Sequence, residues 1–312
     1  RMREKDMRVE KLVKTAEQAG TRIMAAINGD YFWAFEEGKH PLGLHVSGGQ
    51  LLRGPSGTTS LVVSPDGKVH MSAPKLEATA LVEDVELPIH EFNKLAPRDG
   101  TSLYFGHFAE DVLPQYKCRA IVLETDGDSY VNRVVSAVVI RTLPKVKRLK
   151  LTASESALVV CGQELKGLPL PGAEVTLDLR LEGLTDPVAE AISGGPRILR
   201  QGETVFEGKA EGFAMWRRGY LSGTHPRTAL GIGADGTTLY LIVAEGRPGG
   251  LNAIGAACVL KGLGAEEAML LDGGGSSVMV WEDSIVNRPH AEKQRTHRRV
   301  ANALAIILEE SE

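Results

Sequence analysis

The sequence of 312 residues predicts an α+β fold: one elaborated domain with few helices, a large mixed and mostly antiparallel β-sheet, and a βαβ unit near the C-terminus. Three observations lead to this class. Short apolar runs separated by Pro and Gly fill residues 58–182 and are typical of strands. Helical periodicity is confined to residues 3–19 and 251–263. No repeat or low-complexity linker divides the chain, which favours a single domain over residues 1–312.

The first expected elements are a helix and a strand. Val9 and Val13 belong to a helical apolar face over residues 3–19, and Gly20 is suited to end that helix. The apolar run at 23–27 then predicts a short strand.

The middle of the chain is expected to be mostly β. A hairpin is predicted from the apolar runs 61–63 and 69–71, which flank Pro65-Asp66-Gly67. Further strands are expected at 78–83, 102–106, 119–124, 134–142, 157–161 and 174–181.

The last third predicts a right-handed βαβ unit. Its strands, 238–244 and 268–271, are joined by a helix that ends at Gly264, so they are expected to run parallel. An antiparallel strand at 228–232 precedes them in a hairpin. The Gly-x-Gly-x-x-Gly run at 231–236 falls in that hairpin with no helix opening after it, so it does not indicate NAD binding.

Polar clusters far apart in sequence are expected to meet at one edge of this sheet. Glu245-Gly246-Arg247 leaves one parallel strand, and Asp272-Gly273-Gly274-Gly275-Ser276-Ser277 leaves the other. His225-Pro226-Arg227 begins the antiparallel strand, and Asn28 and Asp30 follow the strand at 23–27. Ligands in open α/β sheets favour the carboxyl ends of parallel strands, so this edge is the candidate site.

The loop after Asp272 is the strongest candidate. Consecutive glycines let backbone amides approach an anion, and a hydroxyl adds a donor, so Gly273, Gly274, Gly275 and Ser276 are expected to bind substrate. Asp272 can act as a base, position water or hold a cation. The alternative is a glycine-rich turn without a ligand.

Glu245 is the candidate second carboxylate for acid, base or nucleophile chemistry. It can instead form a structural ion pair with Arg227 or Arg247, two arginines whose guanidinium forks also suit phosphate oxygens. Asp30, Glu245 and Asp272 offer oxygen ligands for a divalent cation, but no spacing demands one, and no cofactor is expected to be required.

Three further site candidates each allow two interpretations. His225 is a candidate proton donor or a hydrogen-bonding loop residue. Asn28 and Asp30 either orient a sugar hydroxyl or cap a local turn through their side chains.

Composition excludes several functional classes. The 36 Lys and Arg against 40 Asp and Glu give a net charge of −4 without a basic block, so no nucleic-acid partner is expected. No run of about eighteen apolar residues exists, so no membrane span is expected. Cys118, Cys161 and Cys258 are widely spaced and form no metal motif, so they are expected to be buried free thiols.

Six segments together resemble the phosphodiester glycosidase family, and they occur in the family's order between residues 9 and 308. Each is short, but the ordered set is specific. They are Ala26–Phe32, Ile192–Leu199, His225–Gly231, Leu271–Ser277, Val286–Pro289 and Arg299–Leu304.

The resemblance implies a hydrolase that cleaves the bond between the anomeric carbon of a sugar, such as N-acetylglucosamine, and a phosphodiester. Bacterial relatives suggest roles in exopolysaccharide or cell-wall metabolism. Because a phosphodiester is already a good leaving group, charge stabilisation by Arg227 and the glycine loop is expected to matter more than a general acid. The matching positions expected to line the site are Asn28, Gly194, Gly195, Arg227, Asp272, Gly273, Gly274 and Ser276.

Two departures from the family pattern stand out. The family often has Asp-Gly-Arg where this chain has Glu245-Gly246-Arg247, and its opening strands have no counterpart before Arg1. An excised or processed, exported or cell-surface protein is therefore expected, with a cytoplasmic location as the alternative. Two other functions stay open: a glycan- or teichoate-binding module without catalysis, and a metal-dependent phosphodiesterase that cleaves the P–O bond.

Overall fold

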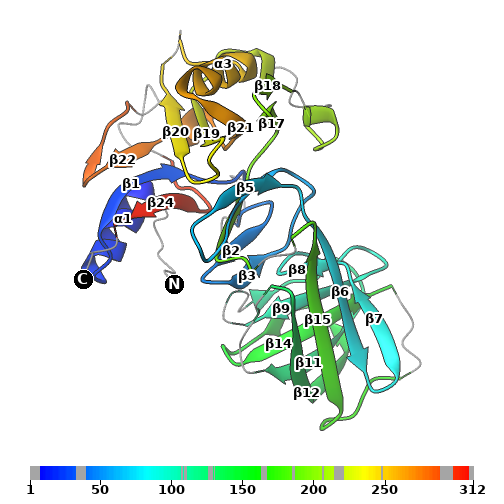
Figure 1. Ribbon diagram of the computed structural model, residues 1–312. Coiled ribbons are helices and arrows are strands. Elements are labelled where there is room, and N and C mark those ends of the chain that lie inside the picture. Colours follow the sequence, from blue (N-terminus) through cyan, green and yellow to red (C-terminus); the bar gives the residue numbers. More distant parts are fainter. Residues whose placement is uncertain are drawn as a thin grey trace. The chain divides into compact units, whose positions relative to one another are not determined.

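The chain forms two compact units in the computed structural model (Figure 1). Unit 1 comprises residues 1–43, 57–73 and 192–312, and unit 2 comprises 44–56 and 74–191. The single domain over 1–312 stays a prediction. The structure describes residues 8–32, 40–106, 108, 111–125, 129, 131–162, 167–184, 187–205, 207–213, 221–246, 249–288 and 298–308.

A five-stranded antiparallel sheet forms the centre of unit 1. Its strand order is β18-β17-β21-β19-β20. Both β20 and β21 pair antiparallel with β19, so they run parallel to each other, as the sequence predicts. They are not neighbours, because β19 lies between them. The strands are β17 (Arg197–Arg200), β18 (Glu203–Thr204), β19 (Arg227–Gly233), β20 (Leu239–Ala244) and β21 (Ala265–Leu270).

The helix α3 (Ala253–Leu263) connects β20 to β21 and covers one face of this sheet. Its contact face is built from small side chains, Ala253, Ala256 and Ala257, which let the helix approach closely. The Asn252 side chain caps its first turn by accepting a hydrogen bond from the Gly255 backbone at 2.7 Å. Gly264 ends it with φ of 104°, as predicted.

The other face of the sheet packs on further strands of unit 1. Leu230 and Met269 of the sheet join Ile27, Leu61 and Met71 in one apolar cluster. The predicted hairpin is confirmed as β4 (Ser60–Val63) and β5 (Val69–Ser72), which pair antiparallel.

A four-stranded sheet of order β23-β22-β1-β24 and the helix α1 (Val9–Gln18) complete unit 1. Val9 and Val13 are buried against this sheet. Gly20 follows the helix with φ of 88°, as its predicted stop role requires. The strands are β1 (Ile23–Asn28), β22 (Met279–Trp281), β23 (Ser284–Ile285) and β24 (Ala303–Ile307).

Unit 2 is built on an eight-stranded sheet of order β7-β6-β15-β12-β11-β14-β9-β8, antiparallel except for the β8–β9 pair. All six strands predicted between 78 and 181 are present. Two strands of this sheet are not among those predicted: β7, an edge strand that contains Pro88, and the two-residue β8. The strands are β6 (Lys75–Val82), β7 (Val85–Ile89), β8 (Glu91–Phe92), β9 (Thr101–Phe105), β11 (Cys118–Thr125), β12 (Arg133–Val146), β14 (Glu155–Cys161) and β15 (Glu174–Glu182).

The prediction of buried free thiols is wrong for two cysteines. Cys118 and Cys161 lie opposite each other on β11 and β14, with Cα atoms 4.1 Å apart, and form a disulfide. Their spacing of 43 residues carries no pairing signal, because the pairing depends on strand register. Cys258 is a free thiol, but it is exposed, not buried.

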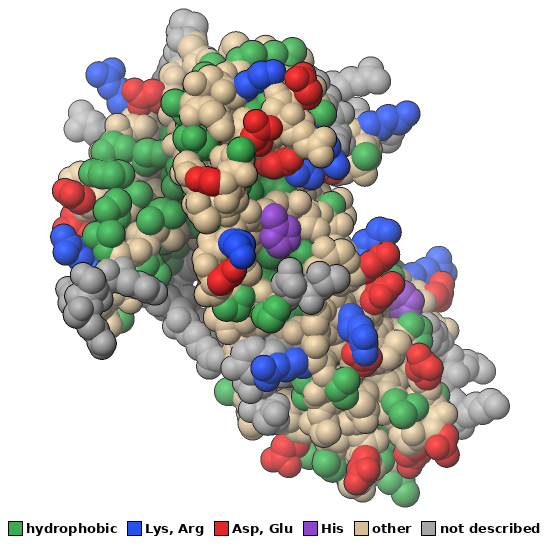
Figure 2. All heavy atoms as spheres, viewed as in Figure 1, with side chains coloured by type: hydrophobic (Ala, Val, Ile, Leu, Met, Phe, Trp, Pro, Cys, Tyr) green, Lys and Arg blue, Asp and Glu red, His purple; other side chains and the backbone are tan. Residues whose placement is uncertain are grey.

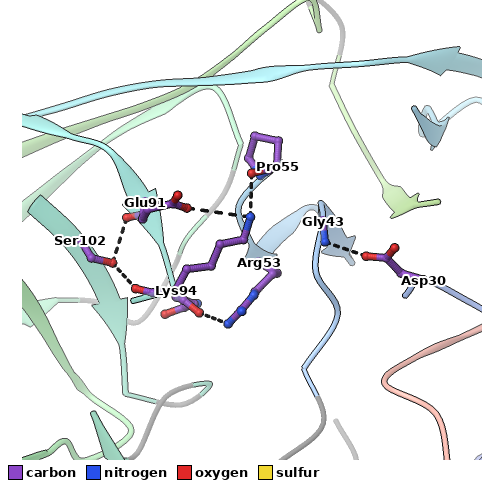
Figure 3. Close-up of polar contacts among 8 residues, drawn as sticks. Asp30, Gly43, Arg53, Pro55, Glu91, Lys94 and Ser102 are labelled. Carbon is purple, nitrogen blue, oxygen red and sulfur yellow. Dashed lines mark hydrogen bonds and ion pairs between the residues drawn. The ribbon is translucent and has the colours of Figure 1, made fainter. Parts of the chain in front are cut away.

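A second structural link in unit 2 fastens β3 (Gln50–Arg53) to β8 and β9 (Figure 3). The Asn93 side chain donates to the Leu52 carbonyl at 2.9 Å and accepts from the Phe105 backbone at 2.9 Å. Lys94 donates to the Pro55 carbonyl at 2.7 Å. The pKa of the Glu91 carboxyl is raised, because the effect of its burial exceeds the opposite effect of the nearby Lys94. Short strands β2 (His45–Ser47), β10 (Asp111–Val112) and β13 (Leu149–Lys150) complete the unit.

The surface has a mixed charge pattern. On the face shown in Figure 2, acidic and basic side chains are interspersed. The expected absence of a nucleic-acid partner stays a prediction. Within the described residues, no helix is long and apolar enough to cross a membrane.

Candidate functional site

The structure brings three of the predicted polar clusters into direct contact within unit 1. Asn28 at the end of β1 donates a side-chain hydrogen bond to the Asp272 carbonyl at 2.6 Å. The Asp272 backbone N–H donates to the Gly29 carbonyl at 3.1 Å. Gly274 donates to the Pro226 carbonyl at 2.8 Å. Hydrogen bonds therefore join the segments near residues 28, 226 and 272 to one another at the strand ends.

Asn28 is the centre of this arrangement and is fully buried. Besides its bond to Asp272, its side-chain oxygen accepts from the Thr228 hydroxyl at 2.7 Å and from the Val278 backbone at 3.1 Å. These partners lie on three different segments, so the side chain does not cap its own turn. Asn28 cross-links the site. Its predicted contact with a sugar hydroxyl stays a prediction.

Asp30 is likewise buried, at 2% exposure. Its carboxylate accepts hydrogen bonds from the Tyr31 and Gly43 backbones, both at 2.7 Å; Figure 3 shows the bond to Gly43. Its own backbone donates to the Asn302 side chain at 2.8 Å. Two backbone donors to one carboxylate fix the loop that follows β1.

Gly194 and Gly195 allow the backbone to approach the end of β21. A Cβ on Gly194 would lie 2.4 Å from the Leu270 carbonyl oxygen, and the Gly195 N–H donates to that same oxygen at 2.8 Å. Gly195 has φ of 100°, which glycine adopts without strain. The Gly195 carbonyl accepts from the Tyr31 hydroxyl at 2.9 Å. Both glycines thus have a packing role, and their substrate contacts stay predictions.

The loop after β21 holds the half-buried carboxylate of Asp272. Its Oδ1 accepts from the Gly273 N–H at 3.0 Å. Gly274 has φ of 63°, so the chain turns sharply into the short 3₁₀ helix η2 (Gly274–Ser276). The Ser276 and Ser277 hydroxyls are buried and form no hydrogen bond with the residues that the structure describes. Buried polar atoms of this kind call for a partner, and a substrate oxygen or a water can supply it.

Arg227 is fully buried at the start of β19. Its Nε donates to the Leu251 carbonyl at 2.9 Å and its Nη2 to the Gly223 carbonyl at 3.1 Å. The guanidinium therefore holds two loops at the strand ends and places a positive charge inside unit 1. Its predicted contact with phosphate stays a prediction.

The remaining candidates differ in exposure. Glu245 is exposed, and its carboxylate accepts from the Arg288 backbone N–H. His225 is half-buried and exchanges backbone hydrogen bonds with Leu251, at 3.2 and 2.9 Å. Arg247 lies outside the described residues. In the described part of the chain, no group of three or more His, Cys, Asp or Glu side chains is placed to hold a metal ion.

Four side chains that support the site are absent from the residues proposed from sequence. Thr228 holds Asn28, Asn302 holds the loop after β1, and Asn287 donates to the Ser277 carbonyl at 3.1 Å. Each lies in one of the family segments, which is the signal that marks them. Glu211 lies in none, yet its buried carboxylate accepts from the Arg197 backbone at 2.8 Å beside the Gly194–Gly195 turn.

Solved structures with the same fold include proteins from Synechocystis, Burkholderia pseudomallei and zebrafish. A hypothetical protein from Synechocystis matches with a TM-score of 0.76 and 20% identity, over 96% of this chain and 54% of that one. A putative exported protein from Burkholderia pseudomallei matches with a TM-score of 0.70 and 18% identity, over 97% and 68%. This chain therefore spans about half the length of the Synechocystis chain.

The third structure is the zebrafish N-acetylglucosamine-1-phosphodiester alpha-N-acetylglucosaminidase catalytic domain, auto-inhibited by its pro-peptide. It matches with a TM-score of 0.52 and 18% identity, over 98% of this chain and 68% of that one. At such identities the likeness to all three shows the fold alone. No curated protein matches the chain.

The family assignment comes from the sequence of the chain. The model of the phosphodiester glycosidase family matches residues 123–307, more than half of the 312 residues. Five of the six segments singled out from sequence lie inside this match. The chain therefore belongs to the phosphodiester glycosidase family.

Proposed function

We propose that this protein hydrolyses a sugar-1-phosphodiester by cleaving the C–O bond at the anomeric carbon, with Asp272 as the base that activates water. One observation carries the proposal: a half-buried carboxylate stands at the head of a glycine loop whose backbone is fastened to β1 and to the start of β19. Family membership supports the reaction class. The name of the zebrafish protein makes N-acetylglucosamine the first sugar to test.

The reaction balances without a cofactor. Water adds its oxygen to the anomeric carbon, its proton passes to the Asp272 carboxylate, and the bond from that carbon to the phosphate oxygen breaks. The products are the free sugar and a phosphate monoester, which leaves with the bonding electron pair. Because the leaving group is an anion, positive charge and oriented donors near the loop lower the barrier. We propose that Glu245 assists as the second carboxylate and His225 as a proton donor.

The buried cation of Arg227 supports this arrangement. Arg227 begins β19 and directly follows Pro226. The Pro226 carbonyl accepts a hydrogen bond from the Gly274 N–H of the loop. We propose that its charge favours the anionic leaving group, with Arg247 as an additional phosphate ligand. We propose that Gly273, Gly274, Gly275 and the buried hydroxyl of Ser276 form the rest of the phosphate-binding site.

The test is hydrolysis of an α-N-acetylglucosaminyl phosphodiester by the wild type and by Asp272→Asn. Asparagine keeps the shape of the side chain but cannot take the proton, so we expect a loss of about a hundredfold or more in kcat. Asp66→Asn, at an exposed hairpin turn of the same unit, is the matched control and should keep full activity. Full activity of Asp272→Asn would contradict the assigned role.

Water labelled with heavy oxygen separates the proposed reaction from its alternatives. Label in the sugar product supports C–O cleavage, whereas label in the phosphate product shows a phosphodiesterase that cleaves P–O. A protein that is stabilised by the phosphodiester but turns none over is a binding module.

A further inference from the structure

We propose that Arg298 is a substrate-binding residue that holds the phosphate of the sugar phosphodiester over the glycine loop, an inference that rests on the proposed function and names a residue of its site. The observation is where the guanidinium lies. A Cβ built on Gly275 would be 3.1 Å from Nη2, 3.3 Å from Cζ and 3.4 Å from Nε of Arg298. The three nearest atoms to that position all belong to this one guanidinium, so it occupies the space that a side chain at 275 would take.

This contact gives a reason for glycine at position 275. Gly274 needs glycine for its φ of 63°, but Gly275 has no such positive angle. What restricts Gly275 is space, and the guanidinium fills that space. The loop and Arg298 are therefore matched to each other, because a side chain at 275 would displace the cation by a few tenths of an ångström or more.

Arg298 is also available to a ligand. Arg298 is an exposed residue, and it takes part in none of the ion pairs between described residues. Arg227 differs, because it is fully buried and donates to two carbonyls. A guanidinium offers paired N–H donors in a planar fork that matches two phosphate oxygens. An exposed, unpaired fork on a glycine loop is suited to such a ligand.

A second observation points to the same place. The hydroxyls of Ser276 and Ser277, next to Gly275, are buried and have no hydrogen-bond partner among the described residues. The two hydroxyls thus directly follow the glycine that Arg298 contacts, and the carboxylate of Asp272 stands at the head of the loop. This order assigns an orientation: the phosphate lies at the Gly275–Ser276 end and the anomeric carbon lies toward Asp272.

The experiment measures binding and turnover separately. Binding of dimethyl phosphate, a phosphodiester without a sugar, is followed by phosphorus NMR, and KM and kcat are measured on the N-acetylglucosaminyl phosphodiester. We expect Arg298→Gln to weaken binding and raise KM by at least about tenfold, since it removes a charged hydrogen-bonding group. Arg298→Lys keeps the charge but not the fork, so its loss should be intermediate. Gly275→Ala should raise KM about threefold or more by displacing the guanidinium.

Two control variants match these changes. Arg22→Gln removes an exposed arginine at the opposite end of β1 from Asn28, and Gly262→Ala adds a Cβ on α3 where no atom lies within 4 Å. Both should leave KM within about twofold. Thermal unfolding of each variant checks that it is folded.

The outcomes are distinct. If Arg298→Gln folds and binds dimethyl phosphate as the wild type does, or if the wild type binds no phosphodiester, the assignment of Arg298 is wrong. If Arg298→Gln does not fold, Gly275→Ala decides by the same criterion. A wild type that binds dimethyl phosphate through Arg298 but hydrolyses no sugar phosphodiester overturns the proposed function and leaves the phosphate subsite standing.

Discussion

The two units of this protein use different means to fix their loops. Unit 1 buries amides and carboxylates at the ends of its strands, where Asn28 and Asp30 bond to segments far away in sequence. Unit 2 also buries an amide cross-link, at Asn93, but its apolar core is closed by a covalent link, the Cys118–Cys161 disulfide. This difference in how the loops are held bears on where the candidate site lies. A buried polar network orients backbone groups but costs desolvation, so the network around Asn28 and Asp30 supports the placement of the candidate site in unit 1.

The largest effect is expected when the network of unit 1 is broken. Asn28→Ala removes the partner of the Asp272 carbonyl, the Thr228 hydroxyl and the Val278 N–H. Each loses a buried or part-buried hydrogen bond, so unit 1 should lose about 4 kcal/mol of stability. Denaturant unfolding followed by a probe in each unit measures the change. A loss below about 1 kcal/mol would show that Asn28 is not a structural cross-link.

A smaller effect, confined to unit 2, is expected from the disulfide. The double variant Cys118→Ala, Cys161→Ala removes a cross-link that closes a loop of 43 residues, which should cost about 3 kcal/mol. Hydrolytic activity should persist at temperatures where the variant stays folded, because the site residues lie in unit 1. Cys258→Ala is the matched control and should change neither quantity. Loss of activity in the folded double variant would mean that unit 2 contributes to catalysis.

The smallest effect concerns pH. Burial lowers the pKa of His45 on β2 to about 4. Between pH 6.5 and 4 the unfolded chain takes up a proton that the folded chain does not, so unit 2 loses stability as pH falls, and the loss levels off below 4. The side chain is partly exposed, so we expect about 2 kcal/mol between pH 7.5 and 4.5. His45→Gln should show a correspondingly smaller loss in urea unfolding at the two pH values. An equal loss would rule out His45 as the source.

Sequence patterns predicted both helices, the longer strands and the meeting of three of the four polar clusters, but not short strands such as β17, β22 and β24. The strands of unit 2 were predictable because apolar residues recur between Pro and Gly, and the parallel direction of β20 and β21 followed from the helix that joins them. The proline in β7 hid an edge strand, since it interrupts the expected pattern.

Partners distant in sequence were not predictable. Thr228 bonds to Asn28 across 200 residues, and the two bonded cysteines meet only because β11 and β14 pair in one particular register. For the same reason Arg298 carries no local signal of its contact with Gly275. Motif positions marked the region of the site, but only the fold shows which side chains are buried supports and which are exposed.

The bond between the Asp30 backbone and the Asn302 side chain spans 272 residues and has a consequence for biosynthesis. At about 5–20 residues per second, a ribosome that has made Asp30 needs roughly 14 to 54 seconds more to make Asn302. During that time residues 74–191, an unbroken stretch, are complete and able to pair their strands. The loop after β1 gains its bond to Asn302 only when the end of the chain has been made. The nascent protein therefore acquires its candidate site last, once the strand β24 has closed beside β1.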